Sequence, residues 1–385
     1  MKRFISSSIP YLRRNPWAIT KLLFSDLYYW FYAKVFRRNI DLPETLGRVL
    51  LVNPAHLGDV VISTAILRDL KLKLPDCSVD FLVGDWAAPV VKGHPGLNQS
   101  FFISHWQANR GDESRIQKKQ HYQRQVNRVV SELKQGAYDA IFFLNSYEPS
   151  FISLFKGFRC PLIGMVSAGG GPLLSFSGDG SATHEVQIQA SIFKPWLGEV
   201  KSADYYQPWL KASVASDRLR TELGLNKTYV VIHPGSGNPA KEWPIRNWAE
   251  VISALAQYDL DIVITGHGER EKNQAELLTS DQIINLVNKL NFDQFTGVVE
   301  GASAVFCVDS LAGHIAGAYD LNAIIIGNGL SKIERWHPLG KKSQLLVKMM
   351  PCSPCHSHPC KERACVTGIT PKMLIDRLPA VLDGQ

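Results

Sequence analysis

Residues 49–83 of this 385-residue chain read VLLVNPAHLGDVVISTAILRDLKLKLPDCSVDFLV. An apolar run at residues 49–53 predicts a buried strand, and a second run at residues 79–83 predicts another. Between them, residues 60–74 have the apolar spacing of a helix and are followed by a proline. A strand, a helix and a second strand in this order predict a βαβ unit with parallel strands.

The same alternation continues along the chain and restarts in its second half. Further strands are expected at residues 140–144, 162–164, 229–233, 261–265, 304–308 and 323–326, and further helices at residues 117–133, 245–257 and 310–318. Such alternation predicts parallel sheets covered by helices on both faces. We therefore expect an α/β protein of two Rossmann-like domains that face each other across a cleft. The glycine-rich residues 168–180 are expected to form a surface loop without regular structure.

Length and pattern divide the chain into four predicted segments. A chain of 385 residues exceeds the usual size of one hydrophobic core, so two domains are expected. The segments are a basic, aromatic N-terminal segment (1–45), two Rossmann-like domains (46–205 and 206–347), and a cysteine-rich segment with a C-terminal helix (348–385). Ligands of such sheets bind outside the carboxyl ends of the strands, so the loops that follow the strands are expected to carry the chemistry.

Positive charge gathers at the N-terminus. The formal net charge is +7, and residues 1–48 carry nine Lys and Arg residues against three Asp and Glu residues. The same segment is rich in aromatic residues, and this combination is typical of a helix that lies on an anionic membrane surface. A helix packed on the protein's own surface or on a second subunit is the alternative interpretation.

The sequence predicts a cytoplasmic protein that is peripheral to a membrane. No stretch of about 18 uncharged apolar residues offers a membrane-spanning helix. Asp26 and Lys34 interrupt residues 22–36, so we expect this segment to be retained rather than cleaved as a signal peptide. The seven cysteines do not indicate a disulfide framework, because four of them crowd into residues 352–365. No nucleic-acid partner is expected.

The loop after the first strand contains a carboxylate at the start of a helix. His56, Gly58 and Asp59 lie in the sequence PAHLGDV, residues 54–60. Asp59 fits a helix N-cap, since Asp is among the preferred residues there. It also fits a general base that takes a proton from an acceptor hydroxyl, and the two roles are compatible.

The loop that begins the second half is rich in small residues. Residues 233–244 read HPGSGNPAKEWP, where the small residues expose backbone N–H groups to an anion and Lys241 adds a positive charge. We expect a diphosphate cradle here. A tight turn with a solvated lysine is the alternative.

Two further loops carry candidate ligand contacts. In VDSLAGH, residues 308–314, Asp309 and Ser310 precede a helix whose first-turn N–H groups suit a diphosphate, and either residue also fits an N-cap. His314, one turn further on, is expected on the same side as Ser310. Glu269 follows the strand expected at residues 261–265. It fits either a contact to a ribose diol or a residue in the first turn of a helix.

Together these loops resemble glycosyltransferase family 9, the ADP-heptose:lipopolysaccharide heptosyltransferases of bacteria. The similar stretches are LLVNPAHLGDVVISTAILRDLKLKLPDCSVDFLV (50–83), VVIHPGSGNPAKEWPIRNWAEVI (230–252) and VFCVDSLAGHIAGAY (305–319), and the tail PCSPCHSHPC resembles the cysteine-rich tail of many members. The chain departs from the family in having Ala65 where members usually have Pro, and in its N-terminal extension.

The resemblance implies a GT-B-type fold and transfer of heptose, with inversion, from ADP-heptose to the inner core of lipopolysaccharide, a glycolipid acceptor. By position it implies that Asp59 is the general base, with His56 and Gly58 on the acceptor side, and that Lys241 is the second catalytic residue and contacts the donor phosphates. The implied donor-binding residues are His233, Gly235, Ser236, Gly237, Lys241, Glu269, Asp309, Ser310, Gly313 and His314. No cofactor is expected for catalysis.

Two other functions fit the same motifs. One is a transferase that uses another nucleotide sugar for envelope polysaccharide or protein. The other is a non-catalytic protein of this fold that binds a nucleotide sugar.

Four cysteines, Cys352, Cys355, Cys360 and Cys365, follow the pattern C-x2-C-x4-C-x4-C. Four thiolates this close fit a structural zinc site, for which Cys-x-x-Cys is a common spacing. A redox-sensitive or disulfide-linked tail and inert thiols are the alternatives.

Overall fold

The computed structural model describes residues 16–37, 40–145, 151–165, 169–211, 217–225, 227–330, 332–355, 360 and 362–382. The chain folds into two compact units, Met1–Lys211 and Ala212–Gln385. The predicted division after residue 205 lies a few residues before this one. The N-terminal segment belongs to the first unit and the cysteine-rich segment to the second.

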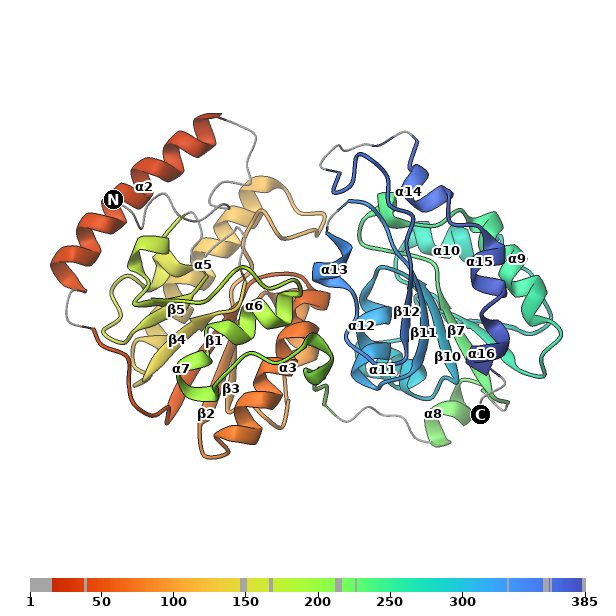
Figure 1. Ribbon diagram of the computed structural model, residues 1–385, viewed down its shortest axis with the longest axis horizontal. Coiled ribbons are helices and arrows are strands. Elements are labelled where there is room, and N and C mark those ends of the chain that lie inside the picture. The colour runs from red at the N-terminus through yellow and green to blue at the C-terminus, as the bar shows by residue number, and fades with distance from the viewer. Residues whose placement is uncertain are drawn as a thin grey trace. The chain divides into compact units, whose positions relative to one another are not determined.

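Six parallel strands form the sheet of the first unit (Figure 1). They are β1 (Arg48–Asn53), β2 (Ser78–Val83), β3 (Gln99–Phe102), β4 (Ala140–Phe143), β5 (Leu162–Gly164) and β6 (Phe176–Ser177), in the order β3-β2-β1-β4-β5-β6. β1 pairs with β2 on one side and with β4 on the other. Strands in this position are covered on both faces, which explains near-continuous apolar runs such as AIFF in β4.

The helices of the first unit are α2 (Pro16–Phe36), α3 (Leu57–Lys73), α4 (Ala88–Val91), α5 (Arg115–Leu133), α6 (Glu185–Ser191) and α7 (Lys194–Leu197). Four 3-10 turns join them: η1 (Asp85–Ala87), η2 (Ile152–Phe155), η3 (Gly171–Leu173) and η4 (Ala203–Tyr205). α3 packs against α6, and all of residues 60–67 are buried. None of the helices in the described ranges is long and apolar enough to cross a bilayer.

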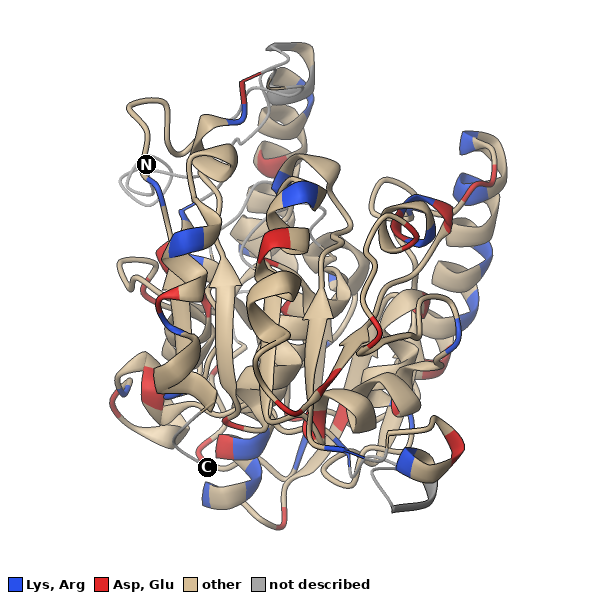
Figure 2. Ribbon diagram, turned by 90° about the vertical axis from the view of Figure 1, so that its right-hand side faces the viewer, with Lys and Arg blue, Asp and Glu red and all other residues tan. Residues whose placement is uncertain are grey.

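The second unit repeats the topology of the first. Its strands are β7 (Tyr229–His233), β8 (Asp261–Ile264), β9 (Ile283–Asn285), β10 (Ala304–Val308), β11 (Asn322–Ile326) and β12 (Ser343–Leu346), all parallel, in the order β12-β11-β10-β7-β8-β9. Numbered within each unit, both sheets have the Rossmann order 3-2-1-4-5-6. Figure 2 shows that charged residues lie mainly on helices and loops, whereas the strands are nearly free of them.

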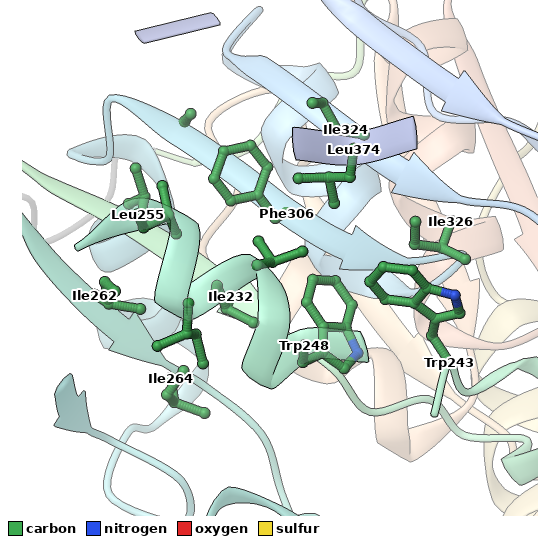
Figure 3. Close-up of a cluster of buried hydrophobic side chains, with 14 of the residues drawn as sticks. Ile232, Trp243, Trp248, Leu255, Ile262, Ile264, Phe306, Ile324, Ile326 and Leu374 are labelled. Carbon is green, nitrogen blue, oxygen red and sulfur yellow. The ribbon is translucent and has the colours of Figure 1, made fainter. Parts of the chain in front are cut away.

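The helices of the second unit are α8 (Asp217–Glu222), α9 (Ile245–Leu255), α10 (Glu269–Ala275), α11 (Phe292–Glu300), α12 (Leu311–Ala318), α13 (Ile333–Trp336), α14 (Ala364–Thr367), α15 (Pro371–Ile375) and α16 (Leu378–Leu382), with the 3-10 turn η5 (Pro239–Lys241). Trp243 and Trp248 meet edge to face with ring centroids 5.0 Å apart in the core that Figure 3 shows. Trp243 donates its indole N–H to the carbonyl of Ile369 at 2.8 Å, and Leu374 of α15 lies in the same core. The C-terminal tail therefore completes the core of this unit.

The two Rossmann-like domains predicted from sequence are confirmed, and three details differ. The glycine-rich stretch 168–180 is not free of regular structure, because it contains η3 and β6, which pairs with β5. α3 begins at Leu57, three residues before the predicted start, since the loop turns directly into the helix. Strands β3, β9 and β12 were not predicted, because edge strands of three or four residues leave little periodic signal.

Candidate active site

Three neighbouring strands of the second unit bring an ion pair together at their carboxyl ends. Asp309 follows β10, Lys241 lies in the loop after β7, and Asn328 lies just after β11. Lys241 Nζ is 2.8 Å from Asp309 Oδ2, and Asn328 Nδ2 donates to the same oxygen at 2.9 Å. β7 and β10 are the pair at which the strand order reverses, and this is where ligands bind in open α/β sheets.

The Asp309 carboxylate stays ionised although it is buried. Burial by itself raises its pKa, but Lys241, together with His314 and the Asn328 amide, outweighs that effect and lowers the pKa below its usual value. The side chain of Lys241 is 27% exposed, against 4% for Asp309. The lysine thus keeps access to solvent while its partner is held inside.

The first turn of α12 lies directly beyond this pair. Ser310 is its N-cap residue by backbone conformation but makes no side-chain cap hydrogen bond. Within the described part of the chain, the buried atoms Ser310 Oγ and His314 Nδ1 have no hydrogen-bond partner. Burial lowers the pKa of His314 to about 4, so the ring is neutral at pH 7. Unsatisfied buried polar atoms beside helix N–H groups are typical of a site for a polar ligand.

Gly313 serves the packing of α12. A Cβ at this position would lie 3.0 Å from Pro338 Cγ and 3.3 Å from Cys307 Sγ. The helix therefore sits close to the sheet, and the backbone N–H of Gly313 still belongs to its first turn.

The loops after β7 and β8 close around the carboxylate of Glu271. A Cβ at Gly235 would lie 2.0 Å from Glu271 Cδ, and a Cβ at Gly266 would lie 2.7 Å from Glu271 Oε2. His267 donates its backbone N–H to Glu271 Oε2 at 2.9 Å, and burial raises the pKa of this carboxyl group. Glycine at both positions therefore leaves room for the end of the Glu271 side chain between the two loops.

Arg270 holds the same loop from the side. Its Nη2 lies 2.6 Å from the carbonyl oxygen of Ser236 and 2.7 Å from Glu242 Oε1. Ser236 and Glu242 are themselves buried, whereas Gly237 is exposed. The ion pair between Arg270 of α10 and Glu242 therefore fixes the loop, in which Gly237 is exposed to solvent.

His233 and Glu269 differ in how far they enter the site. His233, the last residue of β7, has Nδ1 3.0 Å from Thr265 Oγ1, and burial lowers its pKa to about 4. The Glu269 side chain is 78% exposed and lies 3.8 Å from Lys272 Nζ. Glu271, two residues further on, is the carboxylate that enters the loops, and sequence reasoning missed it because the glycine packing that positions it is tertiary.

In the first unit, Asn53 and Asp59 shape the loop after β1. Asn53 is buried, accepts the N–H of Ala55 at 3.1 Å, and donates to Ser63 Oγ at 2.7 Å. Asp59 is half-buried, and its Oδ2 accepts the backbone N–H of His56 at 3.1 Å. The N-cap interpretation of Asp59 is wrong in position, because His56 is the N-cap residue and Asp59 is the third residue of α3.

The acceptor-side candidates His56 and Gly58 flank Asp59. The His56 ring lies beside Trp86, with ring centroids 6.0 Å apart, and Trp86 donates its indole N–H to the carbonyl of Ala55 at 2.7 Å. Gly58 is the second residue of α3 and is half-buried. An aromatic side chain is thus tied to the loop that carries the carboxylate.

The cysteine tail lies partly outside the described residues. Cys352 is exposed, and Cys355, Cys360 and Cys365 are half-buried. Among the residues that the structure describes, no three His, Cys, Asp or Glu side chains converge as a metal site, and residues 356–359 are not described. The structural zinc stays a prediction.

The model of glycosyltransferase family 9 (heptosyltransferase) matches residues 126–366, more than half of the chain. The chain belongs to glycosyltransferase family 9. This family 9 protein is therefore a glycosyltransferase. The match includes the loops after β7 and β10 and begins beyond Asp59.

Individual relatives are distant in sequence, and each aligns with most of this chain. The chain is 25% identical to a putative glycosyltransferase of Haemophilus influenzae, over 79% of this chain and 93% of that protein. It is also 25% identical to lipopolysaccharide heptosyltransferase 3 of Escherichia coli, over 68% of this chain and 76% of that protein.

Solved structures confirm the GT-B-type fold of this family 9 member. A family 9 glycosyltransferase from Veillonella parvula matches 90% of this chain and 99% of its own with a TM-score of 0.71 at 15% identity. ADP-heptose lipopolysaccharide heptosyltransferase II from Escherichia coli matches 88% of this chain and 99% of its own chain, with a TM-score of 0.66 at 18% identity.

Proposed function

We propose that the protein transfers a heptose from ADP-heptose to a hydroxyl group of the lipopolysaccharide core, with inversion at the anomeric carbon. The reaction takes place at the cytoplasmic surface of the inner membrane, where a glycolipid acceptor lies. The observation that carries the proposal is the Lys241–Asp309 pair, which stands beside the first turn of α12 at the reversal of the strand order.

The second unit supplies the groups that a departing nucleoside diphosphate needs. Lys241 is partly exposed and provides a cation, and the N–H groups at the start of α12 provide donors with the positive end of the helix dipole. Such fixed groups stabilise charge that develops on the leaving group without a divalent metal ion. Asp309 holds Lys241 in place before the donor binds and contacts the heptose afterwards.

The buried polar atoms of α12 fit the same donor. Ser310 Oγ and His314 Nδ1 gain partners when phosphate oxygens occupy the first turn. Because His314 is neutral at pH 7, it contributes a hydrogen bond rather than a second cation. In the first unit, Asp59 takes the proton of the acceptor hydroxyl as its oxygen attacks the anomeric carbon.

The donor is identified by thermal shift with a panel of nucleotide sugars. ADP-heptose is expected to raise the melting temperature more than ADP-glucose, UDP-glucose or GDP-mannose at equal concentration, since a ligand that binds only the folded state stabilises it by mass action. A larger shift with another nucleotide sugar would replace the donor in this proposal. A shift with ADP-heptose but no transfer to any lipopolysaccharide core would favour a binding protein.

The role of Lys241 is tested by comparing ADP with adenosine. Lys241→Ala should weaken ADP binding about 10-fold or more, since charge-assisted contacts to phosphate are each worth roughly 1.5–3 kcal/mol, and should leave adenosine binding unchanged. Isothermal titration calorimetry gives both affinities. Equal losses for the two ligands would show that Lys241 does not contact the phosphates. Lys289→Ala, on a surface lysine of the same unit, is the control.

A further inference from the structure

Large apolar side chains are exposed along one side of α2. They are Trp17 (83% exposed), Phe24 (70%), Tyr28 (51%), Phe31 (56%) and Val35 (68%). Their spacing of seven, four, three and four residues places them on one face of a helix with 3.6 residues per turn. This outer stripe runs for about 27 Å at 1.5 Å per residue. An apolar stripe of this size on the solvent-exposed side of a helix indicates an interaction site.

The opposite face of α2 is docked on the first unit. Asp26 is buried, and its Oδ1 accepts the backbone N–H groups of Gly169 at 3.0 Å and Gly170 at 2.8 Å. Tyr29 and Tyr32 pack against the core of this unit. In Figure 1, α2 (red) lies at the margin of the first unit. The outer stripe cannot turn inward without breaking these contacts.

The charges around the outer stripe are positive. The charged side chains of α2 are Lys21, Asp26 and Lys34, and both lysines are exposed while the carboxylate is buried. Lys156, from the 3-10 turn region after η2, lies 5.3 Å from the centroid of the Tyr28 ring. Residues 1–15 add Lys and Arg residues and no Asp or Glu in the sequence.

We propose that the outer stripe of α2 lies in the headgroup region of an anionic bilayer, with the helix axis in the membrane plane. Exposed aromatic residues flanked by lysines are what an interfacial helix presents, and α2 does not qualify as a membrane-spanning helix. Pairing of two such stripes in a symmetric dimer would bring like charges together, which disfavours a second copy as the partner. The assignment rests on the proposed function for the presence of a membrane-embedded acceptor.

The test is co-sedimentation of the full-length protein with vesicles of phosphatidylcholine and phosphatidylglycerol (3:1) that contain no glycolipid. Phe24→Ser/Phe31→Ser should lower the partition coefficient at least 10-fold. Lys21→Gln/Lys34→Gln should lower it roughly 25-fold at low salt, since each basic residue near an anionic surface contributes about five-fold. Leu72→Ser/Leu277→Ser is the matched control, because these side chains are 69% and 66% exposed on other helices or turns, and should leave binding unchanged.

Three results would overturn the assignment. The first is vesicle binding that stays unchanged in both α2 variants, and the second is equal binding of the wild-type protein to vesicles of pure phosphatidylcholine. The third is a dimer, seen by sedimentation velocity, that Phe24→Ser/Phe31→Ser converts to a monomer without loss of vesicle binding. An unchanged melting temperature shows that each variant is folded. Since neither donor nor glycolipid is present, failure of the proposed glycosyl transfer would not affect the outcome.

Discussion

At the scale of single residues, the buried Asp309 carboxylate shows how the donor side is prepared. Its cation comes from the loop after β7 and its amide partner, Asn328, from the residues after β11. The motifs in the sequence nominate Lys241 and Asp309 separately. They do not indicate Asn328, because no local pattern marks an asparagine whose side chain reaches the end of the neighbouring strand.

Asp59→Asn is expected to abolish glycosyl transfer and to preserve the fold. The amide oxygen of Asn still accepts the N–H of His56, whereas an amide does not take a proton from an acceptor hydroxyl. The rate of transfer should fall at least 100-fold while donor affinity, measured by calorimetry, stays within two-fold.

The control for Asp59→Asn is a substitution at the start of α5, where the third residue of the helix also accepts the backbone N–H of the N-cap residue. Gln117 Oε1 accepts the N–H of Ser114 at 2.9 Å, and this pair is exposed. Gln117→Ala should lower stability by about 0.5–2 kcal/mol, as loss of a helix cap does, without loss of transfer. Full activity of Asp59→Asn would leave Asp59 with a structural role alone.

His314 is expected to make folding stability depend on pH between 4 and 6.5. Its folded pKa of about 4 lies below the unfolded value of about 6.5, so the unfolded state binds more protons in this range. Stability therefore rises with pH through this window and falls on acidification, by at most about 1.4 kcal/mol per pH unit. Urea unfolding of His314→Gln should show a smaller pH dependence than the wild-type protein. An identical dependence would mean that folding does not lower the pKa of His314.

At the scale of elements, the packing of α12 against the segment between α13 and β12 depends on a second glycine. A Cβ at Gly317 would lie 1.8 Å from the backbone oxygen of Leu339, which a side-chain rotation does not relieve. Gly317→Ala is expected to destabilise the protein by about 1–3 kcal/mol and to lower its melting temperature by several degrees. A Cβ at Gly157 would have its nearest neighbouring atom 3.9 Å away, so Gly157→Ala should change the melting temperature by less than one degree in calorimetry. Similar shifts for the two variants would show that α12 has room to move.

The loop after the first strand of each unit is held in place by different contacts. After β1, the Asn53 side chain bonds both the loop and α3. After β7 and after β8, one glycine in each loop, Gly235 and Gly266, lets the loop close on Glu271. The sequence contains both Asn53 and Glu271, but only the packing of the folded chain reveals which loop each of these side chains enters.

At the scale of the whole molecule, the two units are expected to respond differently to the nucleotide. ADP should slow amide hydrogen exchange in residues 234–241 and 309–314 of the second unit, because both loops contact the diphosphate in the proposal. Residues 54–60 of the first unit should exchange at the same rate with and without ADP. Mass spectrometry of peptic peptides measures both regions, and protection of residues 54–60 alone would reverse the assignment of donor and acceptor sides.

The sequence by itself determined the fold class, the order of the main elements and the family, because buried parallel strands, amphipathic helices and the loops between them leave local patterns. It also marked Lys241, Asp309 and Asp59 as candidates, since each follows a recognisable strand. Tertiary structure decided the rest: that Asp59 is the third residue of its helix, that Glu271 and Asn328 enter the donor loops, and that α2 leaves its aromatic side exposed. These features depend on contacts between residues far apart in the chain, which no local spacing encodes.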